Sequence, residues 1–140
     1  MKKVLFGLLS IAIITGTACK KSKDKPAITK ENLAGTYMIS AATMRMGTSP
    51  EMDMLSQMDA CQKDDKVKLN LDGSFVITDA GTQCDPPGDY TDVWTLSGTQ
   101  ITIDGETGTV TNFDGTYLEV SSEYSDSGIT FAVKTTYKKQ

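Results

Sequence analysis

Hydrophobic residues recur at every second position through most of the chain from Leu33 onward. Polar or small residues, many of them threonine and serine, occupy the positions between them. This period of two is typical of antiparallel strands that bury one face and expose the other. The pattern predicts eight strands, at residues 35–43, 65–71, 74–79, 91–97, 100–104, 107–113, 116–124 and 129–138.

Glycine-containing turns separate the strands, and their lengths set the register in which neighbours pair. A three-residue loop, Leu71-Asp72-Gly73, keeps apolar residues on one face. Gly98-Thr99 fits a two-residue loop with glycine at the first position of a type II′ turn. The same reasoning at each turn predicts these pairs: Leu69 with Phe75, Val67 with Ile77, Leu96 with Ile101, Trp94 with Ile103, Val110 with Leu118, and Val120 with Phe131.

A meander of eight strands exposes two sheet edges unless it closes on itself. We therefore expect an all-β domain over residues 33–140, an antiparallel up-and-down barrel, with a small β-sandwich as the alternative. Between the first two strands, Ser49 fits a helix N-cap and Pro50 the first helical position. A short helix or ordered loop is expected there, lying over a barrel mouth and tied by Cys61.

Residues 1–18 have a different character from the rest of the chain. A basic start, Met1-Lys2-Lys3, precedes an apolar run at 4–14 and then small residues that lead to Cys19. This is the layout of a secretory signal, too short to serve as a permanent membrane helix. It resembles a bacterial lipoprotein signal, which implies lipid attachment at Cys19. Gly16 departs from the usual leucine, and the alternative is an ordinary cleavable signal with an incidental cysteine.

Residues 19–32 are predicted to be a flexible tether, because four lysines crowd its first half. The tether is a solvated spacer, or it lies against anionic head groups. Lys20, directly after Cys19, resembles the pattern of outer-membrane lipoproteins, and no acidic run follows the cysteine. We therefore expect a protein of the cell envelope, held to the outer membrane by its lipid and facing the periplasm.

The chain has a formal net charge of −4, and the folded part is acidic because basic residues crowd the N-terminal region. An acidic surface argues against nucleic acid as a partner. Histidine is absent from the sequence, which removes the commonest general base and the commonest zinc ligand. We find no catalytic constellation and expect neither enzyme activity nor a cofactor.

Cys61 and Cys84 remain as a pair once Cys19 carries the lipid. In an oxidising compartment such a pair predicts a disulfide, which would stabilise the fold by about 3 kcal/mol in the chain-entropy model. A metal pair is the alternative, although no further ligand spacing lies nearby.

Six of the seven methionines lie within residues 38–58. The M-X-M pairs Met44-Arg45-Met46 and Met52-Asp53-Met54 would suit Cu(I), which prefers soft thioether ligands. Methionine is also an adaptable apolar filler. We favour the second interpretation and no metal, with methionines lining the mouth of an apolar ligand pocket. The candidate ligand-binding residues are Met44, Met46, Met54, Met58 and Trp94.

Several short motifs, with Cys61 and Cys84 between them, resemble the lipocalin-like lipoproteins of Gram-negative bacteria. They are Gly35-Thr36-Tyr37, Asp72-Gly73-Ser74-Phe75 and Trp94-Thr95-Leu96 followed by Ile101. The resemblance covers roughly residues 33–137 and implies a barrel. Tyr37 stands where lipocalins carry the tryptophan that plugs the closed end, and its hydroxyl would need a partner.

The function that we expect is binding of a small apolar ligand inside the barrel. An eight-stranded barrel can instead be filled by its own side chains. The alternative is then a periplasmic protein-interaction or inhibitor module with a filled barrel, built on outward-facing aromatic residues. Its face would come from Tyr90, Trp94, Tyr117, Tyr124 and Tyr137, although Trp94 is expected to face inward and Tyr117 outward.

Overall fold

The computed structural model describes residues 25–140. The predicted signal peptide at 1–18, the lipid-attachment residue Cys19 and the start of the predicted tether lie outside the described residues.

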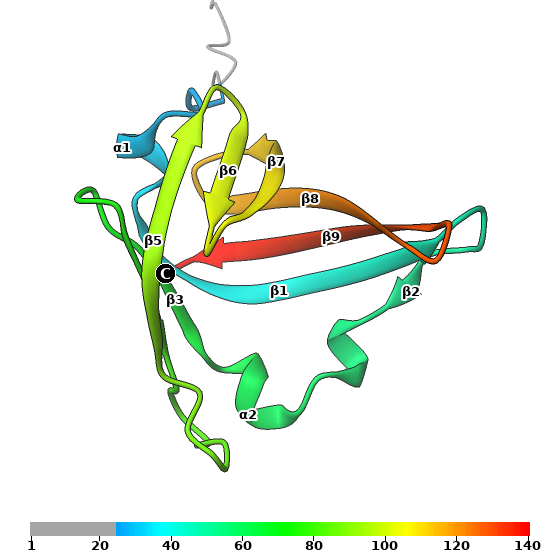
Figure 1. Cartoon of the computed structure of the whole chain (residues 1–140). Helices are drawn as coiled ribbons and strands as arrows, with labels where there is room; N and C mark the ends of the chain where they lie inside the picture. The colour runs from blue at the N-terminus through cyan, green and yellow to red at the C-terminus, as the bar shows by residue number, and fades with distance from the viewer. Residues whose placement is uncertain (1–24) are drawn as a thin grey trace, which may run out of the picture.

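The described residues form one antiparallel sheet that closes on itself (Figure 1). Its order is β2-β1-β3-β4-β5-β6-β7-β8-β9, and β1 also pairs with β9 to close the barrel. The predicted meander is confirmed, with β2 as an extra strand. The strands are β1 Gly35–Met46, β2 Met52–Asp53, β3 Lys66–Leu69, β4 Ser74–Thr78, β5 Tyr90–Ser97, β6 Gln100–Ile103, β7 Glu106–Phe113, β8 Tyr117–Asp126 and β9 Ile129–Lys139.

Four of the six predicted strand pairs are confirmed, and they belong to the two hairpins with the clearest turns. In the β3–β4 hairpin Leu69 faces Phe75 and Val67 faces Ile77. In the β5–β6 hairpin Trp94 faces Ile103 and Leu96 faces Ile101. Turn chemistry alone set the register correctly at these two hairpins.

The pairing predicted for Val110 is wrong, because the register of β7 shifts between Val110 and Asn112. Val110 lies opposite Val120 instead of Leu118, which faces Phe113. The extra residue allows Val110 and Phe113 both to face the core, although they are three positions apart.

The pairing of Val120 with Phe131 is also wrong. Ser127 and Gly128 both have positive φ and form a tight two-residue turn, so that Val120 faces Thr135. The prediction assumed a longer loop, since a serine in this conformation is uncommon.

The segment between β1 and β3 is ordered, but it does not begin with a helix capped by Ser49. Met52 in β2 instead pairs with Met44 in β1. This pairing gives hydrogen-bond partners to backbone groups that a single helical turn would leave without any. A 3₁₀ turn, Leu55–Gln57, and the short helix α2, Ala60–Lys63, follow. Figure 1 shows this segment running from the far end of β1 back to β3. Cys61 in α2 is joined to Cys84 in the β4–β5 loop, which confirms the predicted disulfide.

One end of the barrel is plugged by large side chains. Tyr37 and Trp94 are each 1 % exposed. The Tyr37 hydroxyl donates to the Leu33 carbonyl oxygen at 2.6 Å, and Trp94 Nε1 donates to the Asn70 carbonyl oxygen at 2.8 Å. The predicted plugging role of Tyr37 and its need for a partner are both met. Lys139 lies over the Tyr37 ring and covers the plug from outside.

The ordered domain begins before residue 33, in contrast to the predicted tether. Thr29 caps the short helix α1, Lys30–Leu33, and Ile28 packs against the core. Leu33 is completely buried, because α1 folds over the plugged end. No helix among residues 25–140 has the length and apolar character needed to cross a membrane.

Candidate functional site

The barrel is only partly filled by its own side chains. Between the plug and the open end lies a chamber of about 190 Å³. Its walls are aliphatic and aromatic, as is usual for small-molecule sites. The lining residues are Tyr37, Val67, Leu69, Phe75, Ile101, Ile103, Leu118, Val120 and Tyr137.

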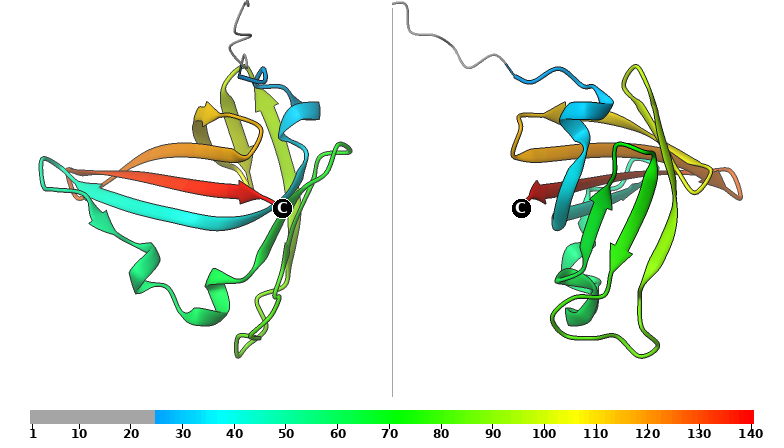
Figure 2. Two further views of the ribbon diagram at one scale, coloured as in Figure 1. Left: turned by 180° about the vertical axis from the view of Figure 1, so that it is seen from behind. Right: turned by 90° about the vertical axis from the view of Figure 1, so that its left-hand side faces the viewer.

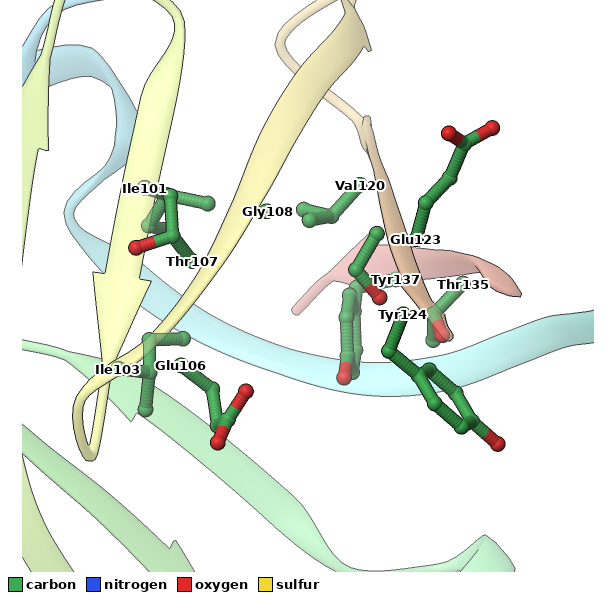
Figure 3. Close-up of a pocket in the computed structure, with 11 residues that line it drawn as sticks. Ile101, Ile103, Glu106, Thr107, Gly108, Val120, Glu123, Tyr124, Thr135 and Tyr137 are labelled. Carbon is green, nitrogen blue, oxygen red and sulfur yellow. The ribbon is translucent and has the colours of Figure 1, made fainter. Parts of the chain in front are cut away.

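Two larger hollows adjoin this chamber. The first, of about 370 Å³, lies between the β6–β7 hairpin and strands β8 and β9 (Figure 3), and shares Ile101, Ile103, Val120 and Tyr137 with the chamber. The second, of about 380 Å³, lies beside α2 and the β4–β5 loop and shares Val67 and Tyr137 with it. The chamber therefore borders a hollow on each of two sides, and the hollows have the size of small-ligand pockets.

Tyr137 is the residue common to all three spaces. It faces inward from β9 opposite Leu118, and Figure 3 shows its ring among the side chains that line the first hollow. None of the hydrogen bonds found among residues 25–140 involves its hydroxyl. Burial raises the pKa of Tyr137 above its ordinary value, so that the phenol stays neutral and can both donate and accept.

Tyr37 provides a contrast within the same chamber. Burial raises the pKa of Tyr37 to about 12, and its hydroxyl is already bonded to Leu33. Tyr37 therefore completes the plug, whereas Tyr137 has a free hydroxyl with which to orient a bound molecule.

Gly108 shapes the first hollow. It occupies an inward position of β7, two residues before the buried Val110. A Cβ at this position would lie 2.7 Å from Val120 Cγ1 and 3.2 Å from the Ser121 carbonyl oxygen. The absence of a side chain therefore preserves space between β7 and β8.

Polar groups line the outer parts of both hollows. Glu106, Thr107 and Thr135 belong to the first, and Gln62 and Asp65 to the second. This arrangement, an apolar interior with a polar rim, suits a ligand that is mainly apolar.

Asp65 lies among other carboxylates at the rim of the second hollow. Burial raises its pKa above the ordinary value, and Asp79, Asp64 and Asp89 act in the same direction, against one hydrogen bond from the Ala80 backbone N–H. Within residues 25–140, no group of three or more cysteine or acidic side chains is placed to hold a metal ion.

Strands β8, β9 and β1 extend together beyond the rest of the barrel, as Figure 2 shows. The inner face of this extension carries an apolar shelf: Met46, Met52, Tyr124, Ile129 and Phe131. The Tyr124 and Phe131 rings stack with centroids 5.0 Å apart. Tyr124 is 52 % exposed and also lines the first hollow, so the shelf continues into the cavity.

The structure does not bring the five predicted ligand residues together. Met58 lines the second hollow, and Met46 belongs to the shelf. Met44 is half-buried on β1 opposite Val133, and Met54 is half-buried just before the 3₁₀ turn. Trp94 is buried in the plug, as its predicted inward orientation requires, and lines none of the three spaces.

The sequence analysis considered Tyr137 only for the alternative interaction face, and it did not single out Gly108. A signal for Tyr137 was present: it lies an even number of residues after Phe131 and Val133, which were predicted to face inward. For Gly108 the signal was weaker, since an isolated glycine in a strand also marks bulges and bends.

Comparison with known proteins adds one finding. A family model described as a lipocalin-like domain matches residues 33–123. Comparisons with curated proteins and with solved structures gave no match. The matched range starts at the buried Leu33 and ends within β8, before the strand that carries Tyr137.

Proposed function

Because the chain belongs to the lipocalin-like domain family, we propose that its barrel binds a small apolar molecule in the cell envelope. The observation that carries this proposal is the unfilled apolar chamber, with Tyr137 lining both the chamber and the two hollows beside it. Burial of apolar surface supplies most of the binding free energy, at about 25 cal/mol per Å². The family fold is in general a non-enzymatic binding fold, and we propose binding rather than catalysis.

The ligand is expected to be apolar over most of its surface and to carry one group that can hydrogen-bond to a phenol. A hydrogen bond of this kind contributes about 0.5–1.5 kcal/mol. It would fix the orientation of the molecule, while the aliphatic walls would tolerate variation in its shape.

The first test is mass spectrometry of an organic extract from the purified protein after exposure to lysate of its own host. A stoichiometric apolar molecule is expected. Folded protein that yields an empty extract, and that also fails to bind a fluorescent apolar probe, would contradict the proposal.

A substitution locates the site. Tyr137→Phe is expected to weaken binding of the identified ligand, or of the probe if it bears an acceptor, by about two- to tenfold. Tyr117→Phe is the matched control, because Tyr117 is exposed on the outer face and should leave affinity unchanged. Equal affinities for all three proteins would exclude a hydrogen bond between the Tyr137 hydroxyl and the ligand.

The apolar shelf supports a second candidate, binding of a protein partner in the envelope. Tyr124 and Met52, 52 % and 43 % exposed, are of the residue types enriched at interfaces. The aromatic residues first considered do not form one face, because Trp94 and Tyr137 are inward and Tyr117 lies at the other end of β8 from Tyr124. Pull-down with the parent chain and a Tyr124→Ser variant distinguishes this candidate: loss of a captured partner only in the variant supports it.

We also propose that Cys19 carries the lipid that holds the domain at the outer membrane, on its periplasmic side. The support is the layout of residues 1–20. The intact mass of the mature protein is expected to show acyl chains on a first residue Cys19, and Cys19→Ala to abolish them and release the protein from the membrane fraction. An unmodified mature N-terminus would contradict this proposal.

A further inference from the structure

Basic side chains gather on one outer face of an otherwise acidic domain. Residues 25–140 contain seventeen acidic and nine basic residues. Three of the nine, Lys66, Lys68 and Lys138, form what we call the basic patch. All three are exposed, and their neighbours in sequence, Val67 and Tyr137, line the cavity. Because side chains alternate across a strand, the three lysines point outward.

The strand register places these lysines around β1. Lys68 on β3 lies opposite Thr36, and Lys138 on β9 lies opposite Met38, two residues further along the same strand. Lys66 is the next outward residue on β3. Strands lie about 4.8 Å apart and rise about 3.4 Å per residue, so two spacings across β1 and two residues along it separate the backbones of Lys68 and Lys138 by about 12 Å.

The basic patch is not neutralised by acidic side chains on the surrounding strands. None of its lysines makes an ion pair or a side-chain hydrogen bond found among residues 25–140. Toward β4 the neighbours of Lys66 and Lys68 are Thr78 and Val76. Toward β8, Lys138 faces Tyr117, and the next outward residue is Glu119.

The carboxylate of Glu119 is directed away from the patch, because it accepts a hydrogen bond from the Thr111 hydroxyl on β7 at 2.6 Å. Arg45 and Lys134, further along β1 and β9, differ from the patch lysines. They share a shallow outer depression with Glu51 and Glu123, which offset their charge.

The chain enters the domain at the end of the barrel that carries the patch. Lys25 Nζ donates to Asn112 Oδ1 at 2.7 Å, and Pro26 lies beside Gly115 in the β7–β8 turn. Tyr117 follows this turn and faces Lys138. Five residues lie between Cys19 and Lys25, so the chain between them reaches at most about 20 Å.

We propose that the basic patch docks on the anionic head groups of the membrane to which the protein is anchored. This inference rests on the anchoring at Cys19 proposed above. An acidic domain is repelled by an anionic surface as a whole, so only an orientation that presents the patch is favourable. Docking in this orientation keeps the Tyr124 side of the first hollow away from the bilayer surface, because Tyr124 lies toward the opposite end of β8 from Tyr117, which faces Lys138.

The expected effect is modest for each lysine and depends on salt. A lysine near an anionic bilayer strengthens association by about fivefold. The attraction falls off within a Debye length, about 10 Å at 0.1 M ionic strength. The lipid supplies attachment, and the patch supplies orientation.

The test is lysine footprinting of the purified mature protein in vesicles of neutral phosphatidylcholine, and in vesicles that also contain phosphatidylglycerol. Each lysine is scored by mass spectrometry after brief amine modification. Lys66, Lys68 and Lys138 are expected to react severalfold more slowly in the anionic vesicles at low salt, and equally fast in both at 1 M salt. Lys63, on α2 and outside the patch, is the internal control and should react equally in both.

A charge reversal provides the matched variant. Lys66→Glu should restore much of the reactivity of Lys68 and Lys138 in anionic vesicles, whereas Lys63→Glu should leave their protection unchanged. Lys66 is exposed and Lys63 is only half-buried at the end of the short helix α2, so neither change should prevent folding.

Three results would overturn the proposal. Equal lysine reactivity in both vesicles, with acyl chains confirmed by intact mass, would refute docking and leave the anchor standing. An intact mass without acyl chains, and protein that remains free of the vesicles, would refute both. If the patch lysines are already protected from modification before vesicles are added, and salt removes this protection, the patch binds a co-purified acidic macromolecule instead.

Discussion

At the scale of single residues, the surroundings of a hydroxyl decide what a tyrosine does. Tyr37 and Tyr137 both line the chamber, and burial raises the pKa of each. The Tyr37 hydroxyl satisfies the Leu33 carbonyl, so its removal would leave a buried acceptor unpaired at a cost of about 1–3 kcal/mol. Removal of the Tyr137 hydroxyl breaks no such bond. Loss of the Tyr37 hydroxyl is therefore expected to lower the stability of the fold, whereas loss of the Tyr137 hydroxyl is expected to lower the affinity for the ligand.

Gly108→Ala is expected to destabilise the barrel by about 1–3 kcal/mol, the usual cost of overpacking. The new methyl group would lie 2.7 Å from the Val120 side chain and 3.2 Å from the Ser121 backbone, and the second of these cannot rotate away. The same change should weaken binding of a fluorescent apolar probe, because it narrows the first hollow.

Urea denaturation and probe titration measure these two effects of Gly108→Ala. Thr109→Ala is the control, since Thr109 is exposed on the next position of β7. Unchanged stability of the Gly108 variant would mean that β7 and β8 separate easily at this point.

Asp65→Asn is expected to raise the free energy of unfolding at pH 7. The folded-state pKa of Asp65 lies above its unfolded value, first because burial desolvates the carboxylate and then because Asp79, Asp64 and Asp89 lie near it. A group of this kind favours the fold below its unfolded pKa, near 4, and loses that contribution as pH rises through the folded value. Asparagine remains neutral and can still accept from the Ala80 N–H.

The advantage of Asp65→Asn should therefore disappear below about pH 4. Urea titrations at a series of pH values measure it, with Glu123→Gln, at an exposed site, as control. A variant that is less stable than the parent at pH 7 would contradict the predicted direction of the change in the free energy of unfolding.

At the scale of elements, the sequence predicted strands well and irregularities poorly. The turns at Asp72-Gly73 and Gly98-Thr99 need a residue with positive φ, which glycine adopts without strain: φ is +94° at Gly73 and +59° at Gly98. The register of the strands beside these two turns could therefore be predicted. Ser127 adopts positive φ without being glycine, and no residue type marked the register shift after Val110. Both exceptions depend on contacts between strands, which local sequence does not encode.

The same limit applies to the candidate site. The methionine-rich segment was predicted to be near a mouth, and Met58 does line the second hollow. The residues that line the chamber come from six strands, so the lining depends on the register of the closed barrel. Trp94 was expected to face inward and to contact the ligand; it does face inward, but it is buried in the plug and does not line the chamber.

Removal of the disulfide by Cys61→Ser and Cys84→Ser is expected to lower the free energy of unfolding by about 3 kcal/mol, from the loss of a crosslink over 23 positions. The β4–β5 loop should keep part of its order, because Asp79 accepts from the backbone N–H groups of Cys84 and Gly88 at 3.0 and 2.9 Å. Probe binding should weaken, since both α2 and this loop line the second hollow.

Urea denaturation of the oxidised parent, the reduced parent and the double variant checks this prediction. The reduced parent should match the double variant, which should not respond to reductant. Equal midpoints for all three would show that the bridge does not constrain the unfolded chain.

At the scale of the whole molecule, β9 is the strand that closes the sheet into a barrel. It pairs with β1 from Tyr37 to Met46 and with β8 from Tyr117 to Asp126, and it carries Tyr137. The lipocalin-like match nevertheless ends at residue 123, before β9 begins. Strand β9 was identified only by its alternating pattern at Ile129, Phe131 and Val133, and its pairing with the distant β1 could not be read from turns.

Truncation after residue 123 is therefore expected to abolish the closed barrel, although it retains the whole range matched by the family. The truncated chain would leave β1 and β8 with long unpaired edges and would open the apolar chamber to water, which favours aggregation. Size-exclusion chromatography and urea denaturation should show oligomers without a cooperative transition, whereas removal of Gln140 alone should leave a monomer that unfolds cooperatively. A monomeric truncated chain with a cooperative transition would show that β1 and β8 can close the barrel without β9. The chamber would then have to be lined without Tyr137, which β9 supplies.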